Sequence, residues 1–234
     1  MPLSGQGVGY AGALSFIDFS SSGFRVVCAV VALSVRPLVE TLVLHCSLNP
    51  GLEEFGTLFL LAYVFLLRVP SEALPAVKSD SGMIPGAQST LYLSGDELCL
   101  RLLRRKNKRS GSLLCRKCWC GESAITCPIH SLWSRVEKLP QGSPLFAGVT
   151  PARALRVLRD ALAALQVADY MEFGTHGFRR GHTEDLRRSG ASLKTILAAA
   201  EWRSPAFLAY LDLVSLETDF VVQAHADESD DELE

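Results

Sequence analysis

The chain has 234 residues, a formal net charge of −2, 48% hydrophobic residues and 21% charged residues. These values exclude a wholly disordered chain, a collagen and a disulfide-stabilised miniprotein, and they allow one large domain or two small ones. The average charge hides a segregation along the chain. Six of the last eight residues are acidic, so residues 1–226 carry 23 bases and 19 acids, a net charge of +4. Residues 99–117 hold eight bases and no acid, which favours an anionic partner.

Cysteine usage and hydropathy indicate where the protein resides. No charged leader with a short apolar run opens the chain, and the two most apolar runs, 26–35 and 58–67, have ten residues each. A bilayer-spanning helix needs about 20. The seven cysteines are an odd number, and four of them lie between Cys115 and Cys127. We therefore expect an intracellular protein without a membrane segment, whose cysteines are free thiols or metal ligands.

The N-terminal half predicts helices followed by a small sheet. Residues 1–23 are expected to be irregular, and the apolar residues 24–49 to form one or two helices. Residues 52–67 predict a helix that is buried on nearly all sides. Pro70 and Pro75 bracket a short turn of helix. The remaining expectations for this half are a loop at 76–90, strands at 91–93, 98–103 and 112–115, and a polar turn at 106–111.

The C-terminal half reads as irregular over residues 116–150 and as helical after Pro151. A helix is expected from about His176 to Ser189, with Gly190 just past its end. Ser192 is expected to cap a helix over residues 193–201. Ser204-Pro205 then opens a helix that holds Tyr210. The first helix of this half has an apolar stripe made of Leu155, Leu158, Leu162 and Leu165.

Separated polar residues in this layout can converge on one phosphate group. His176 and Arg179 are three residues apart and so share a helix face. Arg68 ends the predicted buried helix, where a charge is costly unless it points into a polar cleft. Two guanidinium groups can clamp a phosphodiester, a tyrosine can attack it, and a lysine can protonate the leaving oxygen. Tyr210 and Lys106 are the candidates for these last two roles.

These residues lie in motifs that resemble the catalytic domain of tyrosine recombinases, the phage integrase superfamily, and most of all the recombinases of eukaryotic mobile elements such as tyrosine-recombinase retrotransposons. Residues 67–74 (LRVPSEAL) resemble the first-arginine box of that family. The C-terminal part of the resemblance rests on residues 175–182 (THGFRRGH), 190–192 (GAS), 201–205 (EWRSP) and 210–211 (YL). The resemblance spans about residues 52–214 and is strongest over 174–212.

The resemblance implies the DNA breaking-rejoining fold of this family, a mostly helical α+β catalytic domain with a small antiparallel sheet. It implies that Arg68 and Arg179 bind the scissile phosphate and stabilise the pentacoordinate transition state. His176 would assist proton transfer, and Trp202, in a place often held by histidine, would support the nucleophile. The implied function is site-specific recombination or integration of double-stranded DNA by a homo-oligomer assembled on it, in the nucleus if the source is eukaryotic.

The chemistry that the resemblance implies needs no metal or other cofactor. Tyr210 would attack the phosphate to form a 3′-phosphotyrosyl intermediate, and Lys106 would protonate the 5′ oxygen. Lys106 is expected at the tip of the hairpin formed around the polar turn. Arg105 and Lys108 are alternative candidates for that position and for the role of acid. The residues expected to contact DNA are Arg104, Arg105, Lys108, Arg153, Arg156 and Arg180.

The expected domain layout leaves alternatives open. Residues 1–49 are expected to be a truncated or degenerate N-terminal helical segment, 50–224 the catalytic domain and 225–234 a disordered acidic tail. The short N-terminal segment lacks the length of the helical arm that closes recombinases around DNA, which favours an inactive DNA-binding relic of a mobile element. A type IB topoisomerase shares the phosphotyrosine chemistry and is the other alternative.

Residues 115–130 are expected to form a zinc-binding loop. Cys115 and Cys118 form one pair with two residues between them, and Cys127 and His130 form another, with Cys120 left over. Three thiolates and one imidazole hold Zn²⁺ tetrahedrally in structural sites. No carboxylate accompanies the set, so the predicted ion is structural and takes no part in catalysis. The competing interpretation is a group of partly exposed free thiols.

Overall fold

The computed structural model of the protein describes residues 36–105 and 110–201. The expectations for residues 1–35, for the hairpin tip at 106–109 and for everything from Trp202 onward lie outside the described residues. They include the helix that holds Tyr210 and the acidic tail.

Two helices near the start of the described chain form the centre of the core. α1 spans Arg36–Leu48 and α2 spans Glu53–Val64. All residues of α2 except its first two are buried, as the apolar run predicts, although the helix ends earlier than expected. Gly56 lets the two helices approach closely, because a Cβ atom there would lie 2.8 Å from Cβ of Cys46.

Four strands form one mixed sheet in the order β1-β2-β3-β4. The three strands expected from the sequence are present as an antiparallel meander of β2, β3 and β4. The expectation of a wholly antiparallel sheet is wrong in one strand, because β1 lies within the predicted loop and pairs in parallel with β2. The strand bounds are Ala76–Lys78, Ser89–Ser94, Glu97–Leu102 and Ser112–Lys117.

Short helical segments connect the main elements. η1 (Val69–Ala73) follows α2, and η3 (Tyr170–Glu172) follows α4 (Pro151–Ala164). η2 (Pro128–Trp133) and α3 (Ser134–Val136) lie where the sequence predicts irregular chain. This segment packs against α2 on one side and against β3 and β4 on the other, so it joins the helices to the sheet.

The last two described helices begin and end where local signals predict. α5 spans Gly177–Arg188, and the chain then leaves through Gly190, whose φ of +79° favours glycine. α6 spans Leu193–Ala200, and the Ser192 hydroxyl accepts a hydrogen bond from the backbone N–H of Thr195. These predictions are confirmed because each depends on one or two neighbouring residues.

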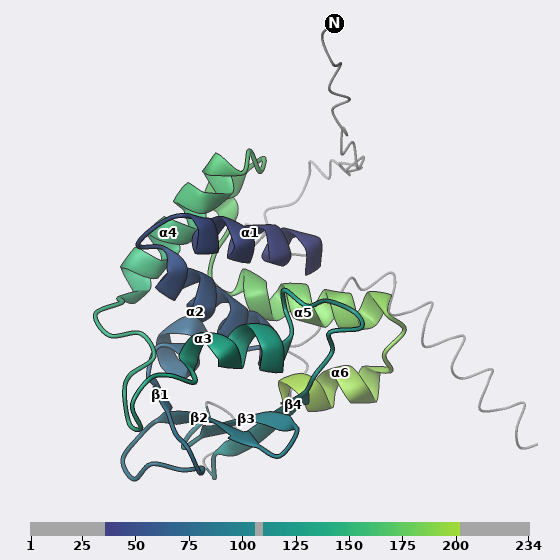
Figure 1. The fold of residues 1–234 in the computed structure, drawn as a ribbon. Coiled ribbons are helices and arrows are strands. Elements are labelled where there is room, and N and C mark those ends of the chain that lie inside the picture. The colour runs from purple at the N-terminus through teal and green to yellow at the C-terminus, as the bar shows by residue number, and fades with distance from the viewer. Residues whose placement is uncertain (1–35, 106–109, 202–234) are drawn as a thin grey trace, which may run out of the picture.

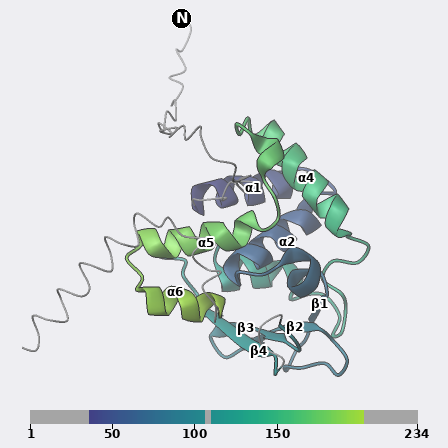
Figure 2. The ribbon, with the colours of Figure 1, turned by 180° about the vertical axis from the view of Figure 1, so that it is seen from behind.

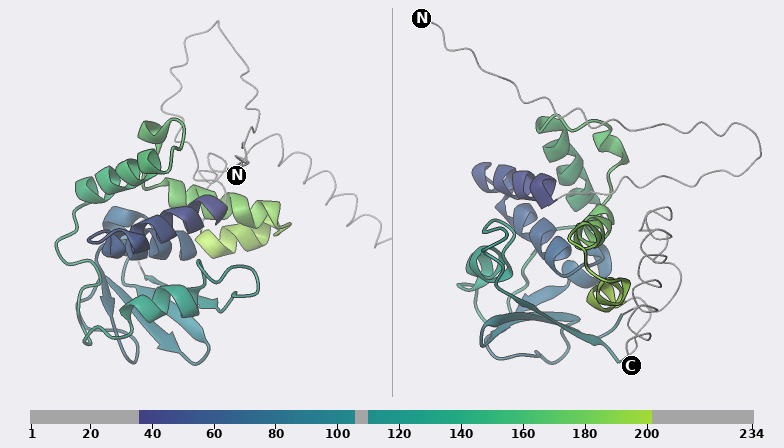
Figure 3. Two further views of the ribbon diagram at one scale, coloured as in Figure 1. Left: turned by 45° about the horizontal axis from the view of Figure 1, so that its top comes forward. Right: turned by 90° about the vertical axis from the view of Figure 1, so that its right-hand side faces the viewer.

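The described chain is therefore an α+β fold with its helices gathered on one side and its sheet on the other (Figure 1). α2 lies centrally, with α1, α4 and α5 packed on it. Seen from behind, α5 runs alongside α2, and α6 lies between α5 and the sheet (Figure 2). Two further views show the same separation of helices and sheet (Figure 3). Within the described residues, each helix falls short of the length or apolarity that crossing a bilayer requires.

Candidate functional site

Glu72 lies at the centre of a buried cluster of charged side chains. Its Oε1 accepts hydrogen bonds from Nη1 of Arg68 and from Nε of Arg105, both at 3.1 Å. Its Oε2 accepts the backbone N–H of Arg68 at 2.9 Å, and Nη1 of Arg179 lies 3.9 Å from the same oxygen. The turn of η1 thus brings one carboxylate to the guanidinium group of nearby Arg68 and to two others, of Arg105 and Arg179, from distant parts of the chain.

The charges around Glu72 keep it ionised. Burial alone would raise the pKa of this carboxyl, but it is outweighed by the charge and hydrogen bonds of Arg105, the Arg68 backbone N–H and the charge of Arg179. The net result is a pKa below the ordinary value. An ionised Glu72 can then hold the three guanidinium groups in fixed orientations.

The end of α6 closes the cluster on a second side. Nη2 of Arg179 donates to the carbonyl oxygen of Ala200 at 2.9 Å. Nη1 of Arg105 donates to Glu201 at 2.9 Å, and the Ser112 hydroxyl donates to the same carboxylate oxygen. Arg105 therefore bridges η1 to the residue that immediately precedes Trp202.

Arg116 adds a fourth guanidinium group next to this cluster. Its Nε donates to the carbonyl oxygen of Val64 at 3.2 Å, and its Nη2 donates to that of Ala199 at 3.2 Å. Burial, with a contribution from the charge of Arg105, lowers the pKa of Arg116 to about 10. The side chain ties α2, β4 and α6 together beside the cluster.

His176 and Arg68 form the accessible edge of the cluster. His176 is exposed at the start of α5, and the side chain of Arg68 is 25% exposed. Partial burial of the imidazole, and then the positive charges of Arg68 and Arg179, lower the pKa of His176. The imidazole therefore lies within electrostatic reach of both arginines.

The structure brings together four residues that the sequence singles out: Arg68, Arg105, His176 and Arg179. Three of these were expected to bind phosphate or move a proton, whereas Arg105 was expected on a DNA-contacting hairpin and is buried instead. Lys106, Lys108, Trp202 and Tyr210 lie outside the described residues. Sequence reasoning did not assign a role to Glu72, although its i,i+4 spacing from Arg68 is typical of an ion pair.

The other residues expected on DNA have varied surroundings. Arg104 and Arg156 are exposed. Arg153 is exposed too, and its guanidinium group lies 5.2 Å from the ring centre of Phe55. Arg180 is half-buried in α5.

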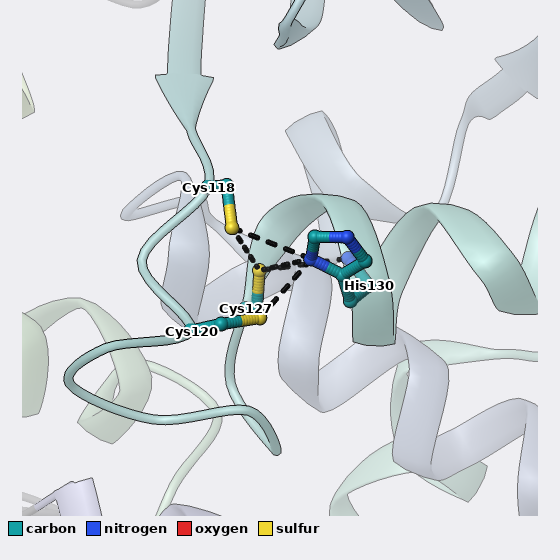
Figure 4. Close-up of side chains that lie close together, drawn as sticks. All are labelled: Cys118, Cys120, Cys127 and His130. Atoms are coloured by element: carbon teal, nitrogen blue, oxygen red, sulfur yellow. Dashed lines mark hydrogen bonds between the residues drawn. The ribbon is translucent and has the colours of Figure 1, made fainter.

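A second group of reactive side chains lies between β4 and η2. Cys118, Cys120, Cys127 and His130 each place one ligand atom within 4.8 Å of the others (Figure 4). Nδ1 of His130 lies 3.3 Å from Sγ of Cys118, 3.0 Å from Sγ of Cys120 and 3.6 Å from Sγ of Cys127. The sulfur atoms of Cys118 and Cys127 are 3.6 Å apart. This cluster could hold a metal ion.

This ligand set differs from the expected one in one residue. Cys115 is directly opposite Cys99 in the register of β3 and β4, and the two form a disulfide. Cys120, which the sequence left over, faces the other three ligand atoms instead. The spacing of cysteines along the chain does not show which of them a strand pairing places beside another cysteine. The sequence therefore could not predict that Cys115 forms a disulfide and that Cys120 takes its place among the ligands.

The environment of Cys127 favours its thiolate. Burial alone would raise the pKa of this thiol, but the backbone N–H groups of His130 and Trp119, together with the His130 side chain, lower it to about 6. A thiolate is the form that binds metals. Cys127 also begins η2, where its sulfur accepts the backbone N–H of His130.

In comparisons with known proteins, no family model matches the chain and no curated protein matches it. Its function is therefore inferred from the two groups of residues described above.

Proposed function

We propose that the protein is a DNA breaking-rejoining enzyme of the tyrosine-recombinase type, which cleaves and rejoins strands of double-stranded DNA through a 3′-phosphotyrosyl intermediate. The observation that carries this proposal is the meeting of Arg68, His176 and Arg179 around the buried carboxylate of Glu72. The motif resemblance assigns Arg68 and Arg179 to the scissile phosphate and His176 to proton transfer.

The charge of the cluster suits an anionic ligand. The guanidinium groups of Arg68, Arg105, Arg116 and Arg179 outnumber the carboxylates of Glu72 and Glu201 two to one. A positive excess in a partly buried site attracts a phosphodiester and stabilises the extra charge of a pentacoordinate phosphorus. Arginine also offers paired N–H donors that match phosphate oxygens.

In this proposal His176 exchanges a proton at the accessible edge, where a lowered pKa keeps its imidazole neutral and able to accept one. Tyr210 would be the nucleophile and Lys106 the acid for the leaving oxygen, with Trp202 supporting the tyrosine. The phosphotyrosyl bond conserves the energy of the broken phosphodiester, so rejoining needs no nucleotide and no metal. The Cys/His cluster would hold a structural zinc ion, because four protein ligands leave no open position for a substrate.

The test is the formation of a covalent protein–DNA adduct. Wild-type protein incubated with a pool of nicked, fluorescent duplexes of random sequence should give an adduct that survives denaturing electrophoresis. Tyr210→Phe should give none, whereas the matched Tyr170→Phe, which alters an exposed tyrosine of η3, should behave as wild type. An adduct that persists in Tyr210→Phe would contradict the assignment.

The arginine cluster is tested in the same assay. Arg68→Gln should form the adduct about 10²–10³-fold more slowly while still binding DNA, because one charge-stabilising donor group is lost from the transition state. Wild-type protein that binds the pool without any adduct would indicate the inactive relic. Relaxation of a supercoiled plasmid without exchange of strands between duplexes would indicate the topoisomerase.

A further inference from the structure

We infer that Cys118, Cys120, Cys127 and His130 bind one zinc ion, and that this ion holds the loop between β4 and η2 against α5 and α1. The inference concerns the architecture of the protein and does not depend on the DNA chemistry proposed above. The identity of the ligands and the docking of the loop on the helices rest on different contacts, so each is tested by its own measurement.

The spacing of the ligand atoms matches a tetrahedral zinc ion. With Zn–S near 2.3 Å and Zn–N near 2.0–2.1 Å, tetrahedral geometry places two sulfurs about 3.8 Å apart and a sulfur and a nitrogen about 3.6 Å apart. Sγ of Cys118 and Sγ of Cys127 are 3.6 Å apart, and the three sulfur–Nδ1 distances are 3.0, 3.3 and 3.6 Å. The two remaining sulfur–sulfur pairs, which both involve Cys120, lie within 4.8 Å, so small side-chain movements would bring all four atoms to one ion.

The chemistry of the ligands selects the ion. Three thiols and an imidazole are the donors of structural zinc sites, whereas calcium and magnesium prefer oxygen. In the close-up view the sulfur atoms and the imidazole point toward one another from two sides, from the loop that leaves β4 and from the start of η2 (Figure 4).

The residues between the ligands contact two helices. Trp119 packs edge-on against the ring of His182 in α5, with ring centres 6.0 Å apart. Glu122 accepts a hydrogen bond from Nη1 of Arg36 at 2.7 Å, and the backbone N–H of Arg36 donates to Asp185 of α5. The loop that the ion closes therefore covers α5 and the start of α1 at the same time.

By fixing this loop, the ion would also stabilise the helices that the loop contacts. The chain between β4 and η2 has no regular secondary structure, and a loop of this kind has few backbone hydrogen bonds to fix it. A four-ligand ion supplies that constraint. Release of the ion would free Trp119 and Glu122 and loosen α5, which His176 directly precedes and whose first turn carries Arg179.

The ligand set is tested with variants of the full chain purified without chelator. Wild type should contain one zinc per chain by elemental analysis, and its X-ray absorption spectrum should fit three sulfur ligands and one nitrogen ligand. Cys120→Ser should lose the zinc, and the matched Cys115→Ser should keep it. Zinc retained by Cys120→Ser, or lost by Cys115→Ser, would overturn the ligand set.

Alkylation of the wild-type chain covers the case in which Cys120→Ser fails to fold. In the presence of a reductant, bound zinc should protect Cys118, Cys120 and Cys127 from iodoacetamide, and a chelator should expose them. The labelling rate of Cys115 should be the same with and without the chelator. Zinc-dependent protection of Cys115, or labelling of Cys120 in the zinc-loaded chain, would reject the assignment.

The contact with α5 is tested by hydrogen exchange. Removing zinc should speed amide exchange in residues 118–133 and in α5, while the paired amides of β2 and β3 keep their protection. Unchanged exchange in α5 after zinc removal would show that the ion orders only its own loop.

Discussion

Glu72 organises the charged cluster, because its carboxylate lies within ion-pair distance of Arg68, Arg105 and Arg179. Its side chain is 3% exposed, so its charge is almost completely removed from water. A buried carboxylate is stable only when hydrogen bonds and opposite charges replace its hydration. The arginines depend on Glu72 in the same way, since its loss would leave buried positive charges facing one another.

Glu72→Gln is therefore expected to destabilise the fold strongly. The variant keeps the shape of the side chain but removes its charge, and breaking a buried ion pair of this kind costs about 3–5 kcal/mol. The matched Glu97→Gln should cost under about 1 kcal/mol, since Glu97 is more exposed and lies 4.0 Å from Nζ of Lys117. Urea unfolding at neutral pH measures both, and equal losses in the two variants would contradict the central position of Glu72.

At the scale of the residue, the sequence predicts which side chains belong to the candidate site better than it predicts which residues they contact. The pairing of Arg68 with Glu72 follows from their spacing in one turn. The approach of Arg105 and Arg179 to the same carboxylate depends on where α5 and the chain just after β3 lie in the fold, and no local sequence pattern predicts that. The same limit applies to Cys115, whose disulfide partner is set by the register of β3 and β4.

At the scale of the element, α5 joins the charged cluster to the helical core. His176 and Arg179 face the cluster, whereas His182 and Asp185 face α2. Nδ1 of His182 donates to the carbonyl oxygen of Tyr63 at 2.7 Å, and the Tyr63 hydroxyl donates to Asp185 at 2.6 Å. A change in the protonation of this interface would therefore act on the helix that carries the site.

The burial of His182 predicts a loss of stability in acid. Burial is the main cause that lowers its pKa to about 4; the charges of Arg116 and Arg36 act in the same direction, and the hydrogen bond to Tyr63 opposes them. Between pH 6.5, the ordinary value, and pH 4, the unfolded chain binds a proton that the folded chain excludes. The contribution of His182 to stability should be constant above pH 6.5, and it should fall by roughly 3 kcal/mol as the pH drops to 4.

His182→Asn tests this expectation, because it removes the titrating group and can keep a hydrogen-bond donor near the carbonyl oxygen of Tyr63. Urea unfolding at several pH values should show a shallower loss between pH 6.5 and 4 than in wild type. Asp185, whose pKa burial raises, contributes in both proteins and cancels in the comparison. A variant profile parallel to that of wild type would assign the acid sensitivity to another group.

The elements that the sequence predicts well are those whose ends are set locally. α5 ends just before Gly190 and α6 begins just after Ser192, as expected, because a glycine with positive φ and a serine cap each act through adjacent backbone groups. β1 and η2 were not predicted. β1 has three residues and exists through its pairing with β2, and η2 is stabilised by packing between α2 and the sheet. Both depend on contacts that are distant in sequence.

At the scale of the whole molecule, two groups of exposed arginines lie far apart on the described fold. Arg101 and Arg104 lie at the end of β3 on the sheet side, and Arg153 and Arg156 lie on α4, at the opposite end of the described fold (Figure 1). Arg105 belongs to neither region, because it is buried and its guanidinium group pairs with Glu72 and Glu201. A duplex that contacts both regions must run along the molecule from the sheet to α4.

Salt dependence of DNA binding separates these regions. Each phosphate contact releases a condensed counterion, so log affinity falls against log salt concentration with a slope of about −0.9 per contact on duplex DNA. If both regions touch DNA, Arg104→Gln and Arg156→Gln should each weaken binding to every sequence and make the slope shallower by about 0.9.

The control is Arg188→Gln, also exposed but paired with Glu184, which should leave the slope unchanged. Fluorescence anisotropy with a labelled random-sequence duplex from low to physiological salt measures all three. A slope that changes with Arg104 alone would confine the DNA to the sheet side, and a slope that changes with neither would place the DNA on another face of the protein.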